Sequence, residues 1–164
     1  MTQLRIFTAR TTVRVAAPPK RVFELFADVD RWPALFGPFV GVERLGFEGA
    51  NERVRFQQRS AHGTRAWTVV HAIDPVRLRV RFRYVDPPGA LTMLGGLCRV
   101  MPKSGDAVVA FDHYFRVAGN DTVTASRVER AIVVNSTRLL TTLQDIVESV
   151  FGTDILAAKR SRAS

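Results

Sequence analysis

The stretch DVDRWPALFGPF, residues 28–39, decides how this chain is organised. Its last eight residues carry four large apolar side chains, namely Trp32, Leu35, Phe36 and Phe39. Two prolines and a glycine prevent a continuous helix here, so we expect one short helical turn with its aromatic side chains on one side. We call residues 32–39 the aromatic knuckle. It could form the wall of an apolar cavity or a structural plug between two elements.

Segments on both sides of the knuckle have clear periodicities. Residues 4–16 are typical of a strand, and residues 20–29 (KRVFELFADV) follow two prolines and repeat their apolar positions at helical spacing. Downstream, short alternating segments separated by turn residues predict six strands, at 39–47, 53–60, 65–73, 77–85, 90–101 and 106–117. Strands this close together form antiparallel hairpins.

The last third of the chain changes to a helical period. Apolar residues from about 126 to 150 predict one long amphipathic helix, the only element large enough to cover one face of the sheet. The predicted class is therefore α+β, with a curved antiparallel sheet around a long C-terminal helix. We expect a single domain over residues 1–158 and a basic, disordered tail over residues 159–164.

Composition narrows the classes of function. The 164 residues contain a single cysteine, no apolar run long enough to span a membrane and no signal-peptide pattern, so we expect a cytoplasmic protein. Phosphate-binding loops, nucleophile elbows and metal-binding spacings are absent from the sequence, so we expect no metal. The net charge of +9 favours an acidic partner. No nucleic-acid-binding motif accompanies that charge, and we expect neither nucleic acid nor a membrane as partner.

Arginines alternate with apolar residues along the segment 77–85. Period two places Arg77, Arg79, Arg81 and Arg83 on one face of the predicted strand. This basic face is either a docking surface for an acidic protein or a solvated face that resists aggregation.

Two histidines are predicted to point into the sheet. His71 shares a strand face with Trp67, Val69 and Ile73, and His113 shares one with Phe111 and Phe115. Buried histidines need hydrogen-bond partners or water. Each could be a satisfied core residue, whereas the pair beside the aromatic knuckle favours a polar patch in an apolar cavity.

The segment VAAPPKRVFELFADVDRWPALFGP, residues 15–38, resembles the aromatase/cyclases of bacterial type II polyketide synthases, members of the START/Bet v 1-like (SRPBCC) superfamily. Later pieces agree in order: Trp67 before Asp74 and Pro75, Met93 before Gly95 and Gly96, His113 before Phe115, then Asn135, Ser136 and Glu148. The resemblance implies a helix-grip fold with an internal cavity. It also implies cyclisation of a poly-β-ketone carried by an acidic acyl carrier protein, without any cofactor.

Three polar groups that the resemblance would place in the pocket are replaced here. An inward Arg becomes His71, a Ser becomes Val69 and a Tyr becomes Phe39. Loss of that Arg would remove a fixed cation that could hold an enolate or ketone oxygen. The resemblance nevertheless implies a substrate pocket, for which we name Trp32, Phe36, Phe39, Trp67, Val69, Met93 and Asn135.

Three functions follow as hypotheses. The first is a polyketide aromatase/cyclase of antibiotic or pigment biosynthesis, with His71 as general acid/base and His113 also in a catalytic role. The second is a non-catalytic carrier of a polyketide, lipid or other hydrophobic ligand, which Val69 and Phe39 favour. The third is an interaction module that binds an acidic partner through Arg77, Arg79, Arg81 and Arg83.

Overall fold

A computed structural model describes the backbone of residues 4–163 and the side chains of residues 4–150. Seven strands form one antiparallel sheet whose order is β1-β7-β6-β5-β4-β3-β2. The elements follow one another as β1 (Phe7–Val15), α1 (Pro19–Ala27), the 3-10 turn η1 (Val29–Arg31), α2 (Trp32–Leu35), β2 (Phe39–Glu48), β3 (Asn51–Ser60), β4 (Gly63–Asp74), β5 (Arg79–Tyr84), β6 (Leu91–Lys103), β7 (Asp106–Val117), the 3-10 turn η2 (Ala118–Asn120) and α3 (Thr122–Ala163).

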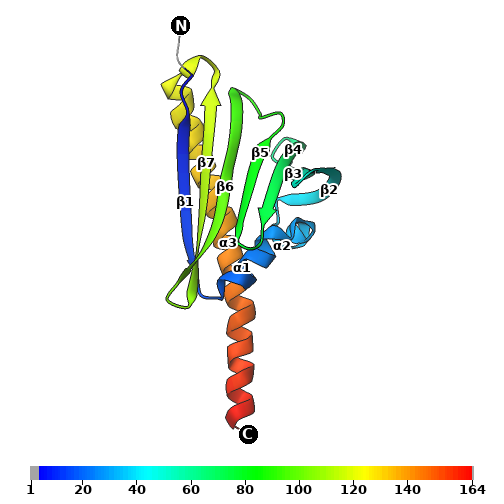
Figure 1. Ribbon diagram of the computed structural model, residues 1–164, viewed down its shortest axis with the longest axis vertical. Helices are drawn as coiled ribbons and strands as arrows, with labels where there is room; N and C mark the ends of the chain where they lie inside the picture. The colour runs from blue at the N-terminus through cyan, green and yellow to red at the C-terminus, as the bar shows by residue number, and fades with distance from the viewer. Residues whose placement is uncertain (1–3, 164) are drawn as a thin grey trace.

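This architecture confirms the predicted α+β helix-grip class, with every predicted strand present in the predicted order. Figure 1 shows α3 running behind the sheet, with α1 and α2 beside its lower end. We call the face that carries α3 the inner face and the opposite one the outer face. The backbone of α3 extends to Ala163, across residues 159–163 that were assigned to the tail, while Ser164 lies outside the described residues.

Helix α3 packs its apolar side against β1 and β7. Leu140, Leu143 and Val147 recur at helical spacing and are almost fully buried against the sheet. Two side-chain contacts fix the helix to β1: the Gln144 amide donates to the Arg14 carbonyl, and Glu148 accepts from the backbone N–H of Ala16. The helix is therefore held in one rotation about its axis.

Two apolar clusters make up the core. The larger joins α1 and the knuckle to α3 and to most strands of the sheet, and the smaller gathers around Leu94, Phe115, Val117 and Ala125. A row of residues that includes buried polar side chains, described below, crosses the inner face among these apolar residues. Its polar side chains are thus flanked along their strands by apolar residues such as Val54, Val69 and Phe111.

Candidate active site

One row of residues crosses the inner face of the sheet on five adjacent strands. Glu52 of β3 lies opposite His71 of β4, which lies opposite Phe82 of β5, and the row continues through Gly96 of β6 to His113 of β7. Directly opposed residues of antiparallel strands point to the same face. His71 and His113 are 4% and 8% exposed, so the prediction that both point inward is confirmed.

The closest polar contact in this row joins His71 to Glu52. His71 Nε2 lies 3.0 Å from Glu52 Oε1, and the Glu52 residue is only 3% exposed. A carboxylate can only accept, so the imidazole donates from Nε2. Glu52 was not predicted as a site residue, because the strand was expected to begin at Arg53. Alternation with Val54 and Phe56, both buried, was the signal that could have found it.

Arg44 of β2 brings a cation to the same carboxylate. Its Nη1 lies 2.5 Å from Glu52 Oε1, and its Nε lies 3.0 Å from Asp30 Oδ2 in η1. These contacts raise the pKa of Arg44, the hydrogen bond to Glu52 being the largest cause. Position 71 itself carries no cation of the kind that the resemblance implies, but Arg44 supplies a fixed guanidinium nearby. The guanidinium comes from a neighbouring strand, two contacts away from His71.

His113 has a very different environment from His71. Its ring stacks on Phe111 with centroids 4.5 Å apart and meets the edge of Phe82 at 5.3 Å. Burial lowers the pKa of His113 to about 4, so the imidazole is neutral near pH 7. In the described part of the chain its buried Nδ1 has no hydrogen-bond partner. His113 can therefore accept or donate a hydrogen bond, but it holds no extra proton to transfer.

The aromatic knuckle packs as a plug in this conformation. The Trp32 indole N–H donates to the Phe26 carbonyl at 3.0 Å, and its ring lies 5.2–5.4 Å from the rings of Phe36, Phe39 and Phe56. Trp32, Phe36 and Val69 are buried in the larger cluster, while Phe39 and Trp67 are half-buried at its border. The knuckle thus joins α1 to β3 through a continuous aromatic contact.

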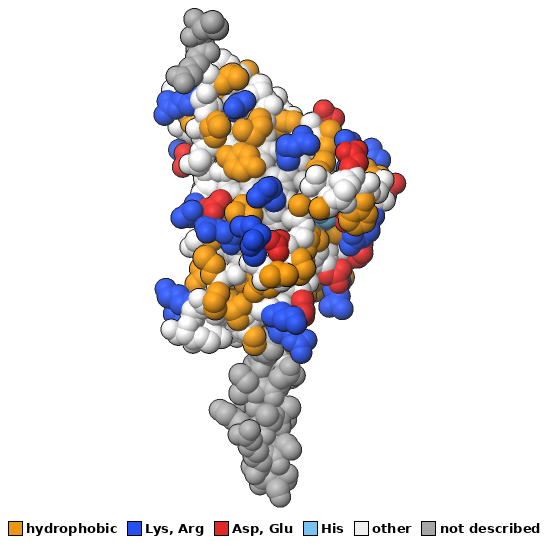
Figure 2. Space-filling view, viewed as in Figure 1, with side chains coloured by type: hydrophobic (Ala, Val, Ile, Leu, Met, Phe, Trp, Pro, Cys, Tyr) orange, Lys and Arg blue, Asp and Glu red, His pale blue; other side chains and the backbone are white. Residues whose placement is uncertain are grey.

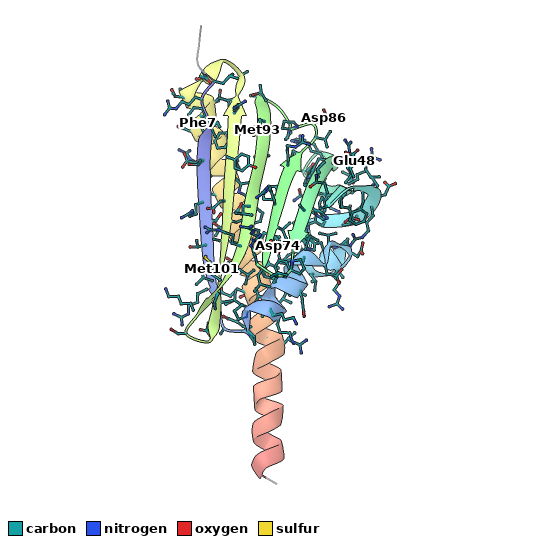
Figure 3. The ribbon with its side chains drawn as sticks, viewed as in Figure 1. Phe7, Glu48, Asp74, Asp86, Met93 and Met101 are labelled. Carbon is teal, nitrogen blue, oxygen red and sulfur yellow. The ribbon has the colours of Figure 1, made fainter. Side chains whose placement is uncertain are left out.

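Two predicted substrate residues lie away from the row. Met93 pairs with Arg116 beyond a β-bulge in β6 and faces outward, whereas its neighbour Leu94 faces the core. Figure 3 shows Met93 near the end of the sheet opposite α1. Asn135 is exposed on α3, because the adjacent Ser136 is the residue that lies on the buried side of the helix. In this conformation neither residue lies beside His71. Their role in substrate binding stays a prediction.

Two open clefts are formed by described residues. One of about 430 Å³ includes Met93, Arg116 and Asn120, and one of about 370 Å³ includes Arg127, Val134 and Asn135. Neither is lined by the histidines or the aromatic knuckle. Within residues 4–150, three potential metal ligands of the His, Cys, Asp or Glu type do not come together.

The basic face is confirmed in part. Arg79, Arg81 and Arg83 alternate with buried residues on β5 and lie on the outer face, which Figure 2 shows from the front. Arg77 instead belongs to the turn before β5, where Leu78 has a φ of 53° and breaks the alternation. Arg77 and Arg79 pair with Asp74. Arg81 and Arg83 have no ion-pair partner among the described side chains.

Comparison with known proteins agrees with this architecture. A family model described as "Polyketide cyclase / dehydrase and lipid transport" matches residues 7–148. The granaticin polyketide synthase bifunctional cyclase/dehydratase of Streptomyces violaceoruber is 37% identical over 139 residues, which are 84% of this chain and 43% of that protein. The chain therefore spans less than half the length of this relative.

None of the described helices is both long and apolar enough to cross a membrane.

Solved structures of aromatase/cyclases superpose on most of the chain. The di-domain aromatase/cyclase BexL of the BE-7585A pathway matches with a TM-score of 0.79 and 28% identity, over 87% of this chain and 46% of that one. The Zhui aromatase/cyclase from Streptomyces sp. R1128 matches with a TM-score of 0.73 and 26% identity, over 88% of this chain and 94% of that one.

Proposed function

Since the chain belongs to the polyketide cyclase/dehydrase and lipid transport family, we propose that it is a polyketide aromatase/cyclase. It directs an intramolecular aldol cyclisation, followed by dehydration, of a poly-β-ketone bound to an acyl carrier protein. The relatives named cyclase/dehydratase and aromatase/cyclase support this assignment. The reaction belongs to aromatic polyketide biosynthesis, and we propose a cytoplasmic location for it.

One observation carries the proposal: the buried imidazole of His71, oriented by Glu52 on the inner face. An imidazole exchanges protons near neutral pH, because its unperturbed pKa is about 6.5. A second group fixes its orientation, as efficient general acid/base catalysis requires. His71 is therefore the general acid/base of the proposed reaction. We assign His113 the narrower role of a hydrogen-bond partner for a substrate oxygen or a water molecule.

The proposed chemistry balances without any cofactor. A proton passes from a methylene between two ketones to His71, and the resulting enolate carbon forms a bond to a ketone carbon of the same chain. The ketone oxygen takes a proton and becomes a hydroxyl. Loss of a second proton from the adjacent carbon, with protonation and departure of the hydroxyl as water, then gives the double bond. One C–C bond forms and one C–O bond breaks, and the remaining steps are proton transfers.

A non-catalytic carrier is the second candidate. The apolar surroundings of the row, including Val69, Phe82 and Phe111, would suit a hydrophobic ligand as well as a reacting chain. The family description also includes lipid transport. A carrier would bind the finished product or the substrate and leave its rate of cyclisation unchanged.

Reconstitution separates these two functions. The chain is added to a minimal synthase, meaning the ketosynthase pair with its acyl carrier protein, and the products are identified by mass spectrometry and NMR. We expect one ring pattern to replace the mixture of spontaneously cyclised products. An unchanged product mixture, together with tight binding of an aromatic product, would favour the carrier.

A further inference from the structure

We infer that Glu52 is a positioning residue, which holds the His71 proton on Nε2 and leaves Nδ1 as the atom that exchanges protons with the substrate. Arg44 in turn fixes the position of Glu52 through an ion pair. This inference rests on the proposed function, because it names the atom of His71 that performs the proposed proton transfer. A chain of contacts across β4, β3, β2 and η1 supports it.

Hydrogen-bond direction determines the tautomer. An ionised carboxylate has no proton to donate, so the 3.0 Å contact between His71 Nε2 and Glu52 Oε1 requires the hydrogen to be on Nε2. A neutral imidazole carries one N–H, and its other nitrogen is then a lone-pair acceptor. Nδ1 is therefore the basic atom of His71. In the Ser-His-Asp triad, a buried carboxylate fixes the tautomer and orientation of a neutral histidine in the same way.

Arg44 explains how the carboxylate can be buried. An unpaired buried charge is strongly destabilising, whereas a paired and hydrogen-bonded one is tolerated. The Arg44 guanidinium contacts Glu52 through Nη1 and Asp30 through Nε, so it is fixed at both ends. It is 40% exposed, while Glu52 is almost fully covered. Arg44 thus neutralises Glu52 from the rim of the site, and its Nη1 shares the oxygen Oε1 with Nε2 of the imidazole.

The chain of contacts also links His71 to the aromatic knuckle. Asp30 lies in η1, two residues before Trp32, and its contact with Arg44 joins that segment to β2. A shift of the knuckle would therefore move Arg44 and, through it, the carboxylate of Glu52. Positions 30, 44, 52 and 71 act as one unit, so the effects of removing two of them should not add.

The test measures two quantities, the tautomer of His71 and the kcat of cyclisation. In the ¹⁵N-labelled chain, the ring nitrogens of His71 are followed by NMR, with His62 and His113 as internal references. We expect protonation on Nε2 in the wild type and a mixture of tautomers in Glu52→Ala. In reconstitution, Glu52→Ala should lower kcat about 10–100-fold with little change in KM, as loss of a partner behind a histidine does in metal sites.

Matched variants keep the inference falsifiable. Glu52→Gln retains an acceptor oxygen and should keep more of the Nε2–H tautomer and more activity than Glu52→Ala. If the alanine variant does not fold, the tautomer of the wild type decides the matter. Glu43→Ala removes an exposed acid that pairs with Arg55 at 3.7 Å, and should change neither readout. Arg44→Met should lower kcat, whereas Arg53→Met, which removes an exposed ion pair with Glu48, should not.

Two results would overturn the inference. One is a wild-type His71 protonated on Nδ1, and the other is a Glu52→Ala variant with both tautomer and kcat unchanged relative to the wild type. Failure of the proposed function is a different outcome: the tautomer responds to Glu52 as expected, yet the wild-type chain does not alter the products of the minimal synthase.

Discussion

His113 is a histidine that the fold keeps neutral. Its pKa of about 4 arises from burial among Phe82 and Phe111, whereas an unfolded chain would bind a proton there near pH 6.5. Between these two values the unfolded state binds more protons, so acid favours unfolding. The contribution of His113 to stability is complete above about pH 6.5 and falls by about 3 kcal/mol as the pH drops to about 4.

Urea titrations of the wild type and His113→Phe across this range measure that contribution. Phenylalanine keeps the stacked ring but cannot titrate, so the free energy of unfolding of the variant should depend less on pH. The difference between the two proteins should appear between about pH 6.5 and 4. Parallel curves for the two proteins would mean that His113 is protonated in the folded state.

Gly96 makes the packing of the central strands possible. A Cβ at this position would lie 2.2 Å from the carbonyl oxygen of Asp112 and 2.5 Å from Cζ of Phe82. We therefore expect Gly96→Ala to force β6 away from β7 or the Phe82 ring out of the core, at a cost of about 1–3 kcal/mol or more. Urea unfolding measures the loss.

Gly37→Ala is the matched control for this change. A Cβ there meets nothing within 4 Å, so the free energy of unfolding should stay within about 0.5 kcal/mol of the wild type. If Gly96→Ala were as stable as Gly37→Ala, the close approach of Phe82 to β6 would be incorrect. The row from Glu52 to His113 would then have a different geometry.

Periodicity was sufficient to predict the strands and the inward histidines. Alternation along β4 and β7 correctly placed His71 and His113, because a strand with one buried face leaves little freedom of register. The long helix followed from the same argument at helical spacing. The sequence alone did not predict which polar groups meet across strands, because the pairing of Glu52 with His71 depends on the β3–β4 register.

Local backbone irregularities account for the other errors. A positive φ at Leu78 ends the alternation before Arg77, and a β-bulge between Leu91 and Met93 moves Met93 to the outer face. Asn135 was misplaced by one helical position, since Ser136 faces the sheet. None of these features has a reliable signature in a single sequence. Of the two alternatives for the knuckle, its packing here favours the plug, because its rings contact one another and Phe56.

The two faces of the sheet have separate tasks in the proposed function. Arg81 and Arg83 lie on the outer face, whereas the histidines lie on the inner face. If the outer face docks an acidic acyl carrier protein, the double change Arg81→Glu/Arg83→Glu should slow association markedly. The effect should shrink with added salt, since exposed charges are screened over about 10 Å at ordinary ionic strength. Stopped-flow binding to the carrier protein measures both.

Arg127→Glu/Arg130→Glu is the control for net charge. It makes the same charge change on the exposed side of α3, so it should reduce association less than the β5 double variant. Equal losses would assign the effect to overall charge. Unchanged association in both variants would leave the outer face as a solvated surface.

The proposed function of the whole molecule depends on His71 as the acid/base of cyclisation. The most direct measurement compares wild type, His71→Ala and His71→Gln in reconstitution with the minimal synthase, with binding of an aromatic product analogue measured in parallel. Both variants should bind the analogue as the wild type does and form directed product about 10²–10⁴-fold more slowly, since neither side chain transfers protons. Full yield and unchanged regiochemistry from both variants would contradict the account.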